Sequence, residues 1–475
     1  MTTAPRPHMR KERDSMGELD VPASAYYGAT TQRAVLNFPI SGIPFSRSFI
    51  RALGQVKQAA AQVNKDLGQL EPKTADAIAA AAQKVIDGKY DAHFPIDIYQ
   101  TGSGTSTNMN ANEVIANVAN KALGQPLGTR KPVHPNDHVN RGQSSNDVIP
   151  TVIHLAAAIA IKEDLLPAMK ELEGSLRARS KEFWPVIKTG RTHLQDATPI
   201  RLGQEFLGFA GQLEYSRQRA HAALGELSVL ALGGTAVGTG IGMHPEFAQR
   251  VVAKLRERTG LDLSETKDHF QAQSTLDAVV QASGALKTVA VSLMKVGNDI
   301  RLMGCGPRAG IGELDIPAVQ PGSSIMPGKV NPVIIESLTM ASARVIGNDT
   351  AITVCAQAGS ILELNVMMPL AAHSLLESIS LLAASCRNFA RQCVNGLKAT
   401  RRGPDMVEQG LAICTALAPV IGYDAAAAIA YKASKSGETV KQVALRETKL
   451  TPAELDKILD PSSMVEPGAS IAGGG

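Results

Sequence analysis

The stretch that decides the fold runs from Gln273 to Met303 and reads QSTLDAVVQASGALKTVAVSLMKVGNDIRLM. Apolar residues recur in it at the three- and four-residue spacing of an α-helix. They are Leu276, Val279, Val280, Leu286, Val289, Ala290, Leu293, Val296 and Ile300. Further alanine, valine and methionine residues widen this stripe to most of the circumference. A helix that is apolar on most sides is expected to be buried among other helices.

Proline placement permits several more helices of this length. The runs 200–244, 246–306, 333–368 and 370–403 contain no proline, the residue that breaks helix interiors. Apolar patterns similar to that of 273–303 predict further long helices at 151–180, 202–232, 333–355 and 361–395. Five long helices that all require burial indicate a helix bundle. Their excess apolar surface predicts an oligomer with helices at the subunit interface.

Length and composition suggest how this bundle is flanked. A chain of 475 residues is long enough for about three domains. We expect an N-terminal helical domain at 1–141, the long-helix bundle at 142–400 and a small, more polar helical domain at 401–475. In the last domain, Tyr423 to Ser434 predicts an alanine-rich helix, and Thr451-Pro452 predicts a capped helix start. The tail from Gly468 to Gly475 is expected to be disordered.

Charge and cysteine content exclude several classes of protein. The 48 Lys and Arg residues against 44 Asp and Glu give a net charge of only +4, too small to indicate nucleic acid or a membrane surface as the partner. The odd count of five cysteines, without a C-x-x-C, predicts a reduced cytoplasmic protein without disulfide bonds or a zinc site. We expect no signal peptide, because residues 1–13 are basic and proline-containing without an apolar stretch, and we expect no membrane helix, because no apolar run approaches ~18 residues.

A loop rich in functional side chains interrupts the helical sequence at residues 322–332, which read GSSIMPGKVNP. Two glycines and two prolines prevent a helix from continuing through it. It is either an ordinary surface turn or a loop that takes part in the chemistry, because it carries serine, lysine and asparagine together.

Three other stretches concentrate hydroxyl, amide and imidazole groups. Residues 101–110 carry serine, threonine and asparagine among glycines, and we expect a helix to follow from about Asn112, whose N-terminus suits an anion. Residues 134–147 contain His134 and His138 four apart, but Pro135 disfavours a helical metal pair. Residues 190–196 place His193 after an apparent Gly-Arg-Thr loop, and we expect it at a helix end facing a cleft.

The glycine-rich segment 233–242 contains G-x-G, but it lacks the strand–helix context of a dinucleotide site, so a tight turn between helices is favoured. The four polar stretches together suit the binding of a small carboxylate and the movement of protons. Residue spacing alone does not identify the reaction.

The loop at 322–332 resembles the signature of the fumarase/aspartase superfamily. From about Lys11 to Pro467 the chain resembles class II fumarase, and residues 101–110 and 233–240 match the other two characteristic regions of that family. The resemblance implies an all-helical, three-domain protein whose central five helices build a twenty-helix core in a homotetramer, with each active site formed by three subunits. It also implies reversible anti elimination of water from (S)-malate to give fumarate, without a metal or other cofactor.

The same resemblance implies roles for individual residues. Ser323 is expected to be the base at C3, and His193, with Glu336 as its carboxylate partner, to act at the hydroxyl or water. The expected substrate-binding residues are Ser103, Gly104, Thr105, Asn108, Ser144, Ser145, Asn146, Thr192, Ser324, Lys329, Val330 and Asn331. A second dicarboxylate site is expected at Lys131, His134, Pro135, Asn136 and Asp137, although relatives often have arginine in place of Lys131.

Two alternatives differ in what they require of the sequence. Aspartate ammonia-lyases share the loop serine, but they usually have glutamine where His193 stands and alanine where Ser103 stands, and Ser-Thr-Asn in place of Ser144-Ser145-Asn146. Segments 26–28 and 105–108 are the features that lean toward aspartase. A non-catalytic structural protein on this fold requires a damaged site, whereas all the implied catalytic residues are present.

Overall fold

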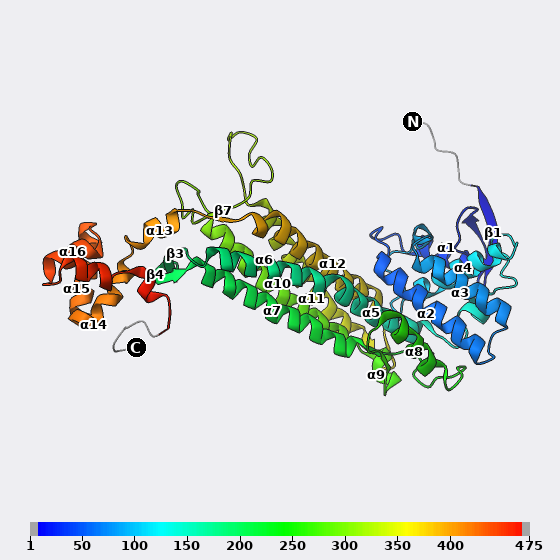
Figure 1. Cartoon of the computed structure of the whole chain (residues 1–475). Coiled ribbons are helices and arrows are strands. Elements are labelled where there is room, and N and C mark those ends of the chain that lie inside the picture. The colour runs from blue at the N-terminus through cyan, green and yellow to red at the C-terminus, as the bar shows by residue number, and fades with distance from the viewer. Residues whose placement is uncertain (1–7, 468–475) are drawn as a thin grey trace. The chain divides into compact units, whose positions relative to one another are not determined.

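The computed structural model describes residues 8–467, so the expected disorder of the C-terminal tail lies outside the described residues. About 62% of the chain is helical, which confirms the all-helical class (Figure 1). The described strands pair only as two-stranded ribbons, five in number. Long helices therefore form the frame, and the ribbons position the loops between them.

The helices and strands have the following bounds. The α-helices are α1 (Ala29–Asn37), α2 (Arg47–Asp66), α3 (Pro72–Ile86), α4 (Thr105–Ala122), α5 (Ser145–Ala160), α6 (Leu166–Phe183), α7 (Leu202–Leu227), α8 (Phe247–Thr259), α9 (His269–Ser274), α10 (Asp277–Met303), α11 (Val333–Gly359), α12 (Met368–Gln392), α13 (Arg402–Val407), α14 (Ala418–Ile421), α15 (Tyr423–Ser436), α16 (Val440–Glu447) and α17 (Pro452–Ile458). The paired strands are β1 (Met9–Asp14) with β2 (Gly17–Pro22), β3 (Ile187–Thr192) with β4 (Gln195–Arg201), β5 (Val229–Leu230) with β6 (Ser264–Glu265), β7 (Leu314–Asp315) with β10 (Lys398–Ala399), and β8 (Ser360–Ile361) with β9 (Leu364–Asn365).

All five predicted long helices are present, with shifted ends. A π-helical turn, η3 (Ile161–Leu165), joins α5 to α6, so the predicted helix at 151–180 is one continuous helical run from Ser145 to Phe183. The prediction from 361 was wrong at its start, because residues 360–365 form the β8–β9 hairpin and α12 begins at Met368. The predicted start at 273 was also early, since Gln273 lies in the separate short helix α9.

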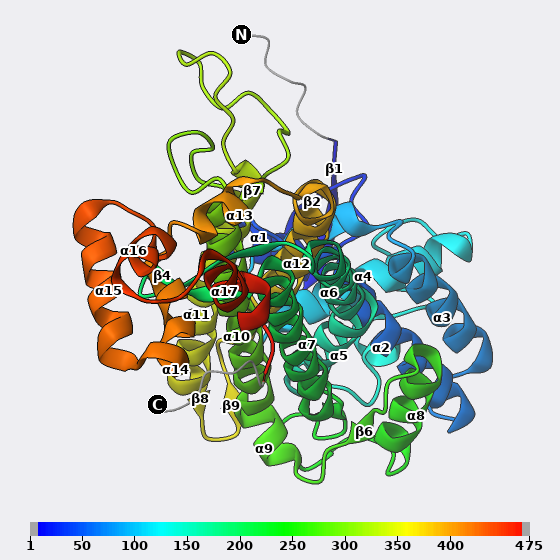
Figure 2. The ribbon, with the colours of Figure 1, turned by 60° about the vertical axis from the view of Figure 1, so that its left-hand side comes forward.

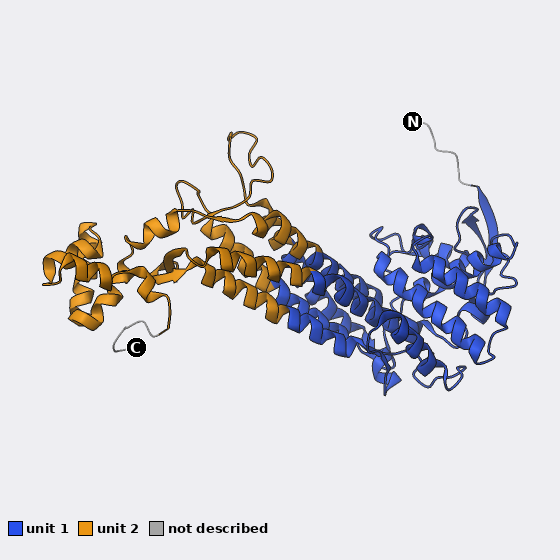
Figure 3. Ribbon diagram, viewed as in Figure 1, with its two compact units in different colours: residues 1–167, 217–290, 341–383 blue, residues 168–216, 291–340, 384–475 orange. Residues whose placement is uncertain are grey.

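The chain divides into two compact units, coloured separately in Figure 3. Unit 1 comprises residues 1–167, 217–290 and 341–383, and unit 2 comprises residues 168–216, 291–340 and 384–475. The boundaries at 216/217, 290/291 and 340/341 fall inside α7, α10 and α11, so each of these helices contributes to both units. The division of the chain at 141 and 400 stays a prediction.

Polar contacts join the long helices inside unit 1. In α11, Asp349 accepts hydrogen bonds from Ser283 (2.8 Å) and Lys287 (2.6 Å) of α10. Asn348 of α11 donates to the Ser378 hydroxyl of α12 at 3.1 Å. These bonds, of which the two from Ser283 and Asn348 are buried, satisfy polar groups and fix which helix faces meet.

In unit 2, small residues allow close packing of the same helices. A side chain at Gly297 of α10 would lie 3.1 Å from Ile335 of α11. The hydroxyls of Ser216 in α7 and Ser292 in α10 are 3.2 Å apart. Glycine and serine at these positions let the helix backbones approach one another.

Helices α14 to α17, which Figure 2 shows in a second view, surround a separate hydrophobic core within unit 2. Its fully buried members include Leu417, Val443 and Leu455. The predicted capped start at Thr451 is confirmed, because its side chain accepts the backbone N–H of Glu454 and Pro452 occupies the first turn. The predicted alanine-rich helix is α15.

Two helices, Asp277–Met303 and Met368–Gly396, are long and apolar enough to span a membrane, with a mean hydropathy of 1.2 over an 18-residue window. We expected no apolar run of this length, and this expectation missed both helices, because charged residues interrupt their apolar sequence. Inside the protein, 50% and 61% of these windows are buried, as expected for core helices of a bundle.

Candidate active site

The first group of predicted site residues meets at the N-termini of α4 and α5 in unit 1. The hydroxyls of Ser103 and Thr105 are 2.8 Å apart, and those of Thr105 and Ser145 are 2.7 Å apart. Gly104 between the first two has a left-handed backbone with φ of 71°, and a Cβ there would lie 2.9 Å from Ile149. Glycine is thus required for the turn that joins three hydroxyl groups in one series of hydrogen bonds.

Helix α4 begins at Thr105, seven residues before the expected start at about Asn112. Serine, threonine and asparagine have modest helix propensity, but here they occupy the first turns of a buried helix whose packing overrides that propensity. The correction changes the site, because Thr105 now lies at the positive N-terminal end of a helix, where an anion is stabilised.

Ser144, Ser145 and Asn146 form the start of α5. The Ser144 hydroxyl accepts the Asn146 N–H at 3.2 Å, and Asp147 accepts the Ser144 N–H at 2.9 Å, which makes a capping box. The Asn146 amide donates to the Ala236 carbonyl at 2.8 Å. The cap and this contact hold the three side chains at the helix end.

The glycine-rich segment 233–242 is a turn, as favoured from the sequence. The second carboxylate oxygen of Asp147, Oδ2, accepts the N–H groups of Gly233 (3.1 Å) and Thr235 (3.0 Å). Asp147 is fully buried, and its burial raises the pKa of the carboxyl. One aspartate therefore joins the start of α5 to the glycine-rich turn.

The second predicted dicarboxylate site surrounds a short π-helix, η2 (Pro135–Val139). A cavity of about 580 Å³ is lined by Gln125, Arg130, Lys131, Pro132, His134, Asp137 and His138. Pro135 is buried and Asn136 is exposed, and neither lines the cavity. Arg130, absent from the sequence-based set, lines the cavity beside Lys131.

The His134 ring in this site accepts the Asp137 N–H through Nδ1 at 3.2 Å. Partial burial lowers the pKa of the His134 imidazole. Within residues 8–467, no group of three or more His, Cys, Asp or Glu residues is arranged to hold a metal ion.

His193 lies in unit 2, at the tip of the β3–β4 hairpin, and this differs from the expected helix end. Residues 190–192 are part of β3, and Thr192 pairs with Gln195 across a two-residue turn. His193 and Leu194 both have left-handed backbones, with φ of 53° and 59°. Such a turn matches the twist of a hairpin, and it leaves Thr192 and His193 exposed.

A buried charge cluster supports the base of this hairpin. Lys188 of β3 contacts Glu205 of α7 at 3.0 Å and Glu313 at 2.9 Å, and Arg191 contacts Glu313 at 2.7 Å. The Lys188 and Glu313 side chains are only 2% and 1% exposed. Burial raises the pKa of Glu205, and the Lys188 ammonium opposes this rise.

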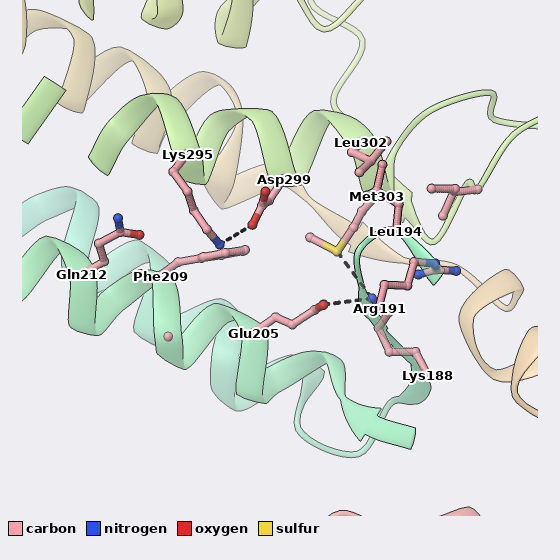
Figure 4. A pocket seen from close by; sticks show the side chains of 12 residues that line it. Lys188, Arg191, Leu194, Glu205, Phe209, Gln212, Lys295, Asp299, Leu302 and Met303 are labelled. Atoms are coloured by element: carbon pink, nitrogen blue, oxygen red, sulfur yellow. Dashed lines mark hydrogen bonds and ion pairs between the residues drawn. The ribbon is translucent and has the colours of Figure 1, made fainter. Parts of the chain in front are cut away.

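Figure 4 shows a cavity of about 440 Å³ beside this charge cluster, with Lys188, Arg191 and Glu205 on its wall. Leu194, the neighbour of His193, also lines it. The charge cluster was missed from the sequence, because four isolated charged residues carry no motif. Its only signal was that lysine and glutamate occur within otherwise apolar segments.

The loop at 322–332 in unit 2 closes on itself. The Gly322 N–H donates to the Lys329 carbonyl at 2.8 Å, and the Asn331 amide donates to the Gly322 carbonyl at 2.8 Å. The Ser323 hydroxyl oxygen accepts the N–H groups of Ile325 (3.2 Å) and Met326 (3.0 Å). The loop thus holds its serine oxygen against two backbone donors.

The remaining predicted residues lie in this loop and at the start of the helix that follows it. Ser324, Lys329 and Val330 are exposed, and Glu336 lies in the first turn of α11. Within the part of the chain that the structure describes, no hydrogen bond or ion pair joins His193 to Glu336 or Lys329 to Ser323. The predicted residues are therefore divided between the α4–α5 group of unit 1 and the hairpin and loop of unit 2.

Comparison with known proteins shows that this helical frame is that of a lyase family. A profile of the lyase family matches residues 17–347, and a profile of the fumarase C C-terminus matches residues 413–466. The chain belongs to the class II fumarate hydratase family, as its similarity to individual members shows.

Fumarate hydratase class II of Methylorubrum extorquens is 51% identical over 466 residues, which cover 98% of each chain. The protein of the same name from Halobacterium salinarum is 52% identical over 460 residues, 97% of each chain. Among solved structures, class II fumarase from Schistosoma mansoni has a TM-score of 0.93 at 38% identity, covering 97% of this chain and all (100%) of that one. A fumarate lyase:delta crystallin from Brucella melitensis bound to cobalt has a TM-score of 0.93 at 44% identity, with the same coverage.

Proposed function

We propose that the protein catalyses the reversible hydration of fumarate to (S)-malate by anti addition and elimination of water. This proposal rests mainly on sequence identity: about half of the positions, over nearly the whole chain, are identical to those of class II fumarate hydratases. His193, Ser103 and Ser144-Ser145-Asn146 favour this reaction over ammonia release from aspartate, because aspartate ammonia-lyases usually differ at these positions.

In the dehydration direction, Ser323 takes the proton from C3 of malate. The electron pair of the C3–H bond passes into the adjacent carboxylate, which becomes an aci-carboxylate. A serine hydroxyl is a weak base, so its alkoxide form must be stabilised. The N–H groups of Ile325 and Met326, at 3.2 and 3.0 Å from Oγ, support this role, because they favour a negative oxygen.

The second step removes the hydroxyl group from C2. The C2–O bond breaks as the C2–C3 double bond forms, and His193, with Glu336 as its partner, gives the proton that turns the leaving hydroxide into water. Thr192, Ser324, Lys329, Val330 and Asn331, together with the α4–α5 residues Ser103, Gly104, Thr105, Asn108, Ser144, Ser145 and Asn146, bind the carboxylates. No metal or other cofactor enters this scheme.

We place each complete site at a meeting of three chains in a homotetramer. The division of the predicted residues between two units, without a His193–Glu336 contact inside one chain, supports this assembly. Exposed apolar residues on the long helices supply the surface for it, including Tyr215, Val291, Met340 and Val354.

We place the protein in the cytoplasm, because its cysteines are free and three of them are buried.

The test is an ultraviolet assay of the unsaturated product, run separately with (S)-malate, L-aspartate and argininosuccinate. Fumarate is expected from malate alone. Release of ammonia from aspartate, without turnover of malate, would replace the proposed function by that of an aspartate ammonia-lyase. Intact tetramer without turnover of any of the three would favour a structural protein.

A further inference from the structure

A lysine lies completely buried beneath the α4–α5 group. Lys57, in the middle of α2, has 0% of its surface exposed. Its ammonium nitrogen, Nζ, donates to two neutral amide oxygens, Oδ1 of Asn140 and Oε1 of Gln143, each at 3.0 Å. Removing an ammonium from water is costly, and two neutral acceptors compensate only part of that cost.

The first acceptor connects Lys57 to a predicted substrate-binding residue. The same Asn140 oxygen also accepts hydrogen bonds from the amides of Asn108 (3.2 Å) and Asn112 (3.1 Å). Within residues 8–467, the amide oxygens of Asn108 and Asn112 are buried without a hydrogen-bond partner. Three donors thus converge on one oxygen, and the orientation of the Asn108 amide depends on where Asn140 is held.

The second acceptor connects Lys57 to the start of α5. The Gln143 amide donates to the carbonyls of Val139 (3.1 Å) and Arg141 (3.2 Å), so this side chain closes the loop that ends at Ser144. Asn140 also donates to the Gln143 carbonyl at 3.0 Å. The conformation of the segment immediately before Ser144 is therefore fixed by bonds that meet at Lys57.

We propose that Lys57 is a positioning residue of the active site, whose Nζ holds Asn140 and Gln143 and thereby sets the positions of Asn108 and of residues 144–146. This inference rests on the proposed hydratase function. It explains why a lysine occupies a core position that a methionine or leucine of similar volume would fill without the cost of a buried charge.

The opposite charge within reach of Lys57 is the buried carboxylate of Asp147, the residue that joins α5 to the glycine-rich turn. Lys57 therefore contacts Gln143, directly before residues 144–146, and interacts electrostatically with Asp147, directly after them. A displacement of even 1 Å at positions that bind substrate costs on the order of a hundredfold in rate. The arrangement is expected to act on substrate binding and turnover rather than on folding.

The experiment compares Lys57→Met and Lys57→Arg with the wild type in the malate assay, after wild-type turnover has been established. We expect Lys57→Met to lower kcat/KM by about 10- to 100-fold, with a raised KM for malate and an unchanged thermal midpoint or a higher one. Lys57→Arg, which keeps the cation and its donors, is expected to recover part of kcat/KM. Lys162→Met is the matched control, because its hydrogen bonds in the described part of the chain go to the carbonyls of Thr259 and Gly260 at the end of α8.

Wild-type kcat and KM in Lys57→Met would overturn the inference, as would a loss of activity that is fully explained by unfolded protein. If Lys57→Met does not fold, Asn140→Ala decides, because this change leaves the lysine in place and removes its link to Asn108, together with the Asn140 bonds to Asn112 and to the Gln143 carbonyl. A rise in KM in folded Asn140→Ala supports the inference, and wild-type kinetics contradict it. An inactive wild type would refute the proposed function instead, so the two failures are distinguishable.

Discussion

At the scale of single residues, Ser323 has the most direct test. Ser323→Ala removes the proposed base but leaves the bonds that close the loop at Gly322 and Asn331. We expect kcat for malate to fall by about a thousandfold, within the range typical of a lost proton-transfer group, with the oligomer intact. Steady-state kinetics and light scattering measure the two effects.

The matched control for that variant is Ser436→Ala, since Ser436 also accepts a turn N–H, from Glu438 at 3.3 Å, but is exposed at the end of α15. Near-wild-type turnover in Ser323→Ala would remove Ser323 as the base. Loss of the oligomer would make the loop a structural element.

Lys57 predicts how stability depends on pH. Burial lowers the pKa of Lys57 from 10.5 to about 7. Below pH 7 the lysine is protonated in both the folded and unfolded states, so its destabilising contribution is constant there. Between pH 7 and 10.5 only the unfolded state keeps the proton, so stability rises with pH by up to ~1.4 kcal/mol per unit.

Thermal midpoints at several pH values from 7 to 9 check this dependence. The difference in midpoint between the wild type and Lys57→Met is expected to increase in favour of the wild type as the pH rises. For Lys162→Met the corresponding difference should stay constant. A constant difference for Lys57→Met as well would contradict the lowered pKa.

At the scale of elements, the β3–β4 hairpin that carries His193 depends on Glu313. Glu313→Gln keeps the shape of the side chain but removes its charge, which leaves Lys188 with Glu205 as its remaining carboxylate partner and takes from Arg191 its ion pair with Glu313. Breaking a buried ion pair in this way costs about 3–5 kcal/mol. We expect a thermal midpoint lower by several degrees and a kcat reduced at least tenfold, because His193 loses its support.

Differential scanning calorimetry and malate kinetics measure these effects of Glu313→Gln. Glu171→Gln is the control, since Glu171 pairs with Arg391 at the surface, where ion pairs contribute little. An unchanged midpoint and kcat in Glu313→Gln would show that the charge cluster does not hold the hairpin.

The same elements show what the sequence was able to predict. Helical periodicity located the five long helices because burial imposes the same spacing on every turn. The start of α4 at Thr105 was missed, since its first turns are polar residues that favour loops when they are considered locally. The hairpin at His193 was missed as well, because left-handed backbones at His193 and Leu194 have no signature in those residue types.

The sequence predicts candidate site residues that belong to a motif. It does not predict residues whose role depends on their burial in the folded chain. The loop serine and the α4–α5 hydroxyl groups followed from motif resemblance, and the structure brings the α4–α5 hydroxyls together. Lys57 and Glu313 were not predicted, because an isolated charged residue in a helix or loop is usually exposed to solvent. Only their surroundings in the folded chain distinguish them.

At the scale of the whole molecule, the proposed tetramer predicts that helix surfaces control activity. Val291 of α10 and Met340 of α11 are 52% and 67% exposed in the single chain. A charge at either position would be buried without a partner at a helical interface, which is strongly unfavourable. We expect Val291→Glu and Met340→Glu to reduce the native mass and to lose at least tenfold in activity, because each proposed site is formed by three chains.

Light scattering coupled to gel filtration measures the mass. Tyr431→Glu is the control, since Tyr431 is 66% exposed on α15, which is not one of the five long helices. A monomeric wild type with full activity would contradict the assembly, and tetrameric, active Val291→Glu and Met340→Glu proteins would place the interface elsewhere.

The loop at 322–332 has a consequence for how such enzymes diversify. The hydrogen bonds that close it at Gly322 and those that the Ser323 hydroxyl accepts run between its own residues. The loop is therefore expected to be transferable between related enzymes as a unit, because it contains both the proposed base and the N–H groups that donate to it. We expect a loop grafted from an aspartate ammonia-lyase to retain malate as the substrate. The leaving group would then be selected by the His193 hairpin and by the N-termini of α4 and α5, while the loop that removes the proton stays the same.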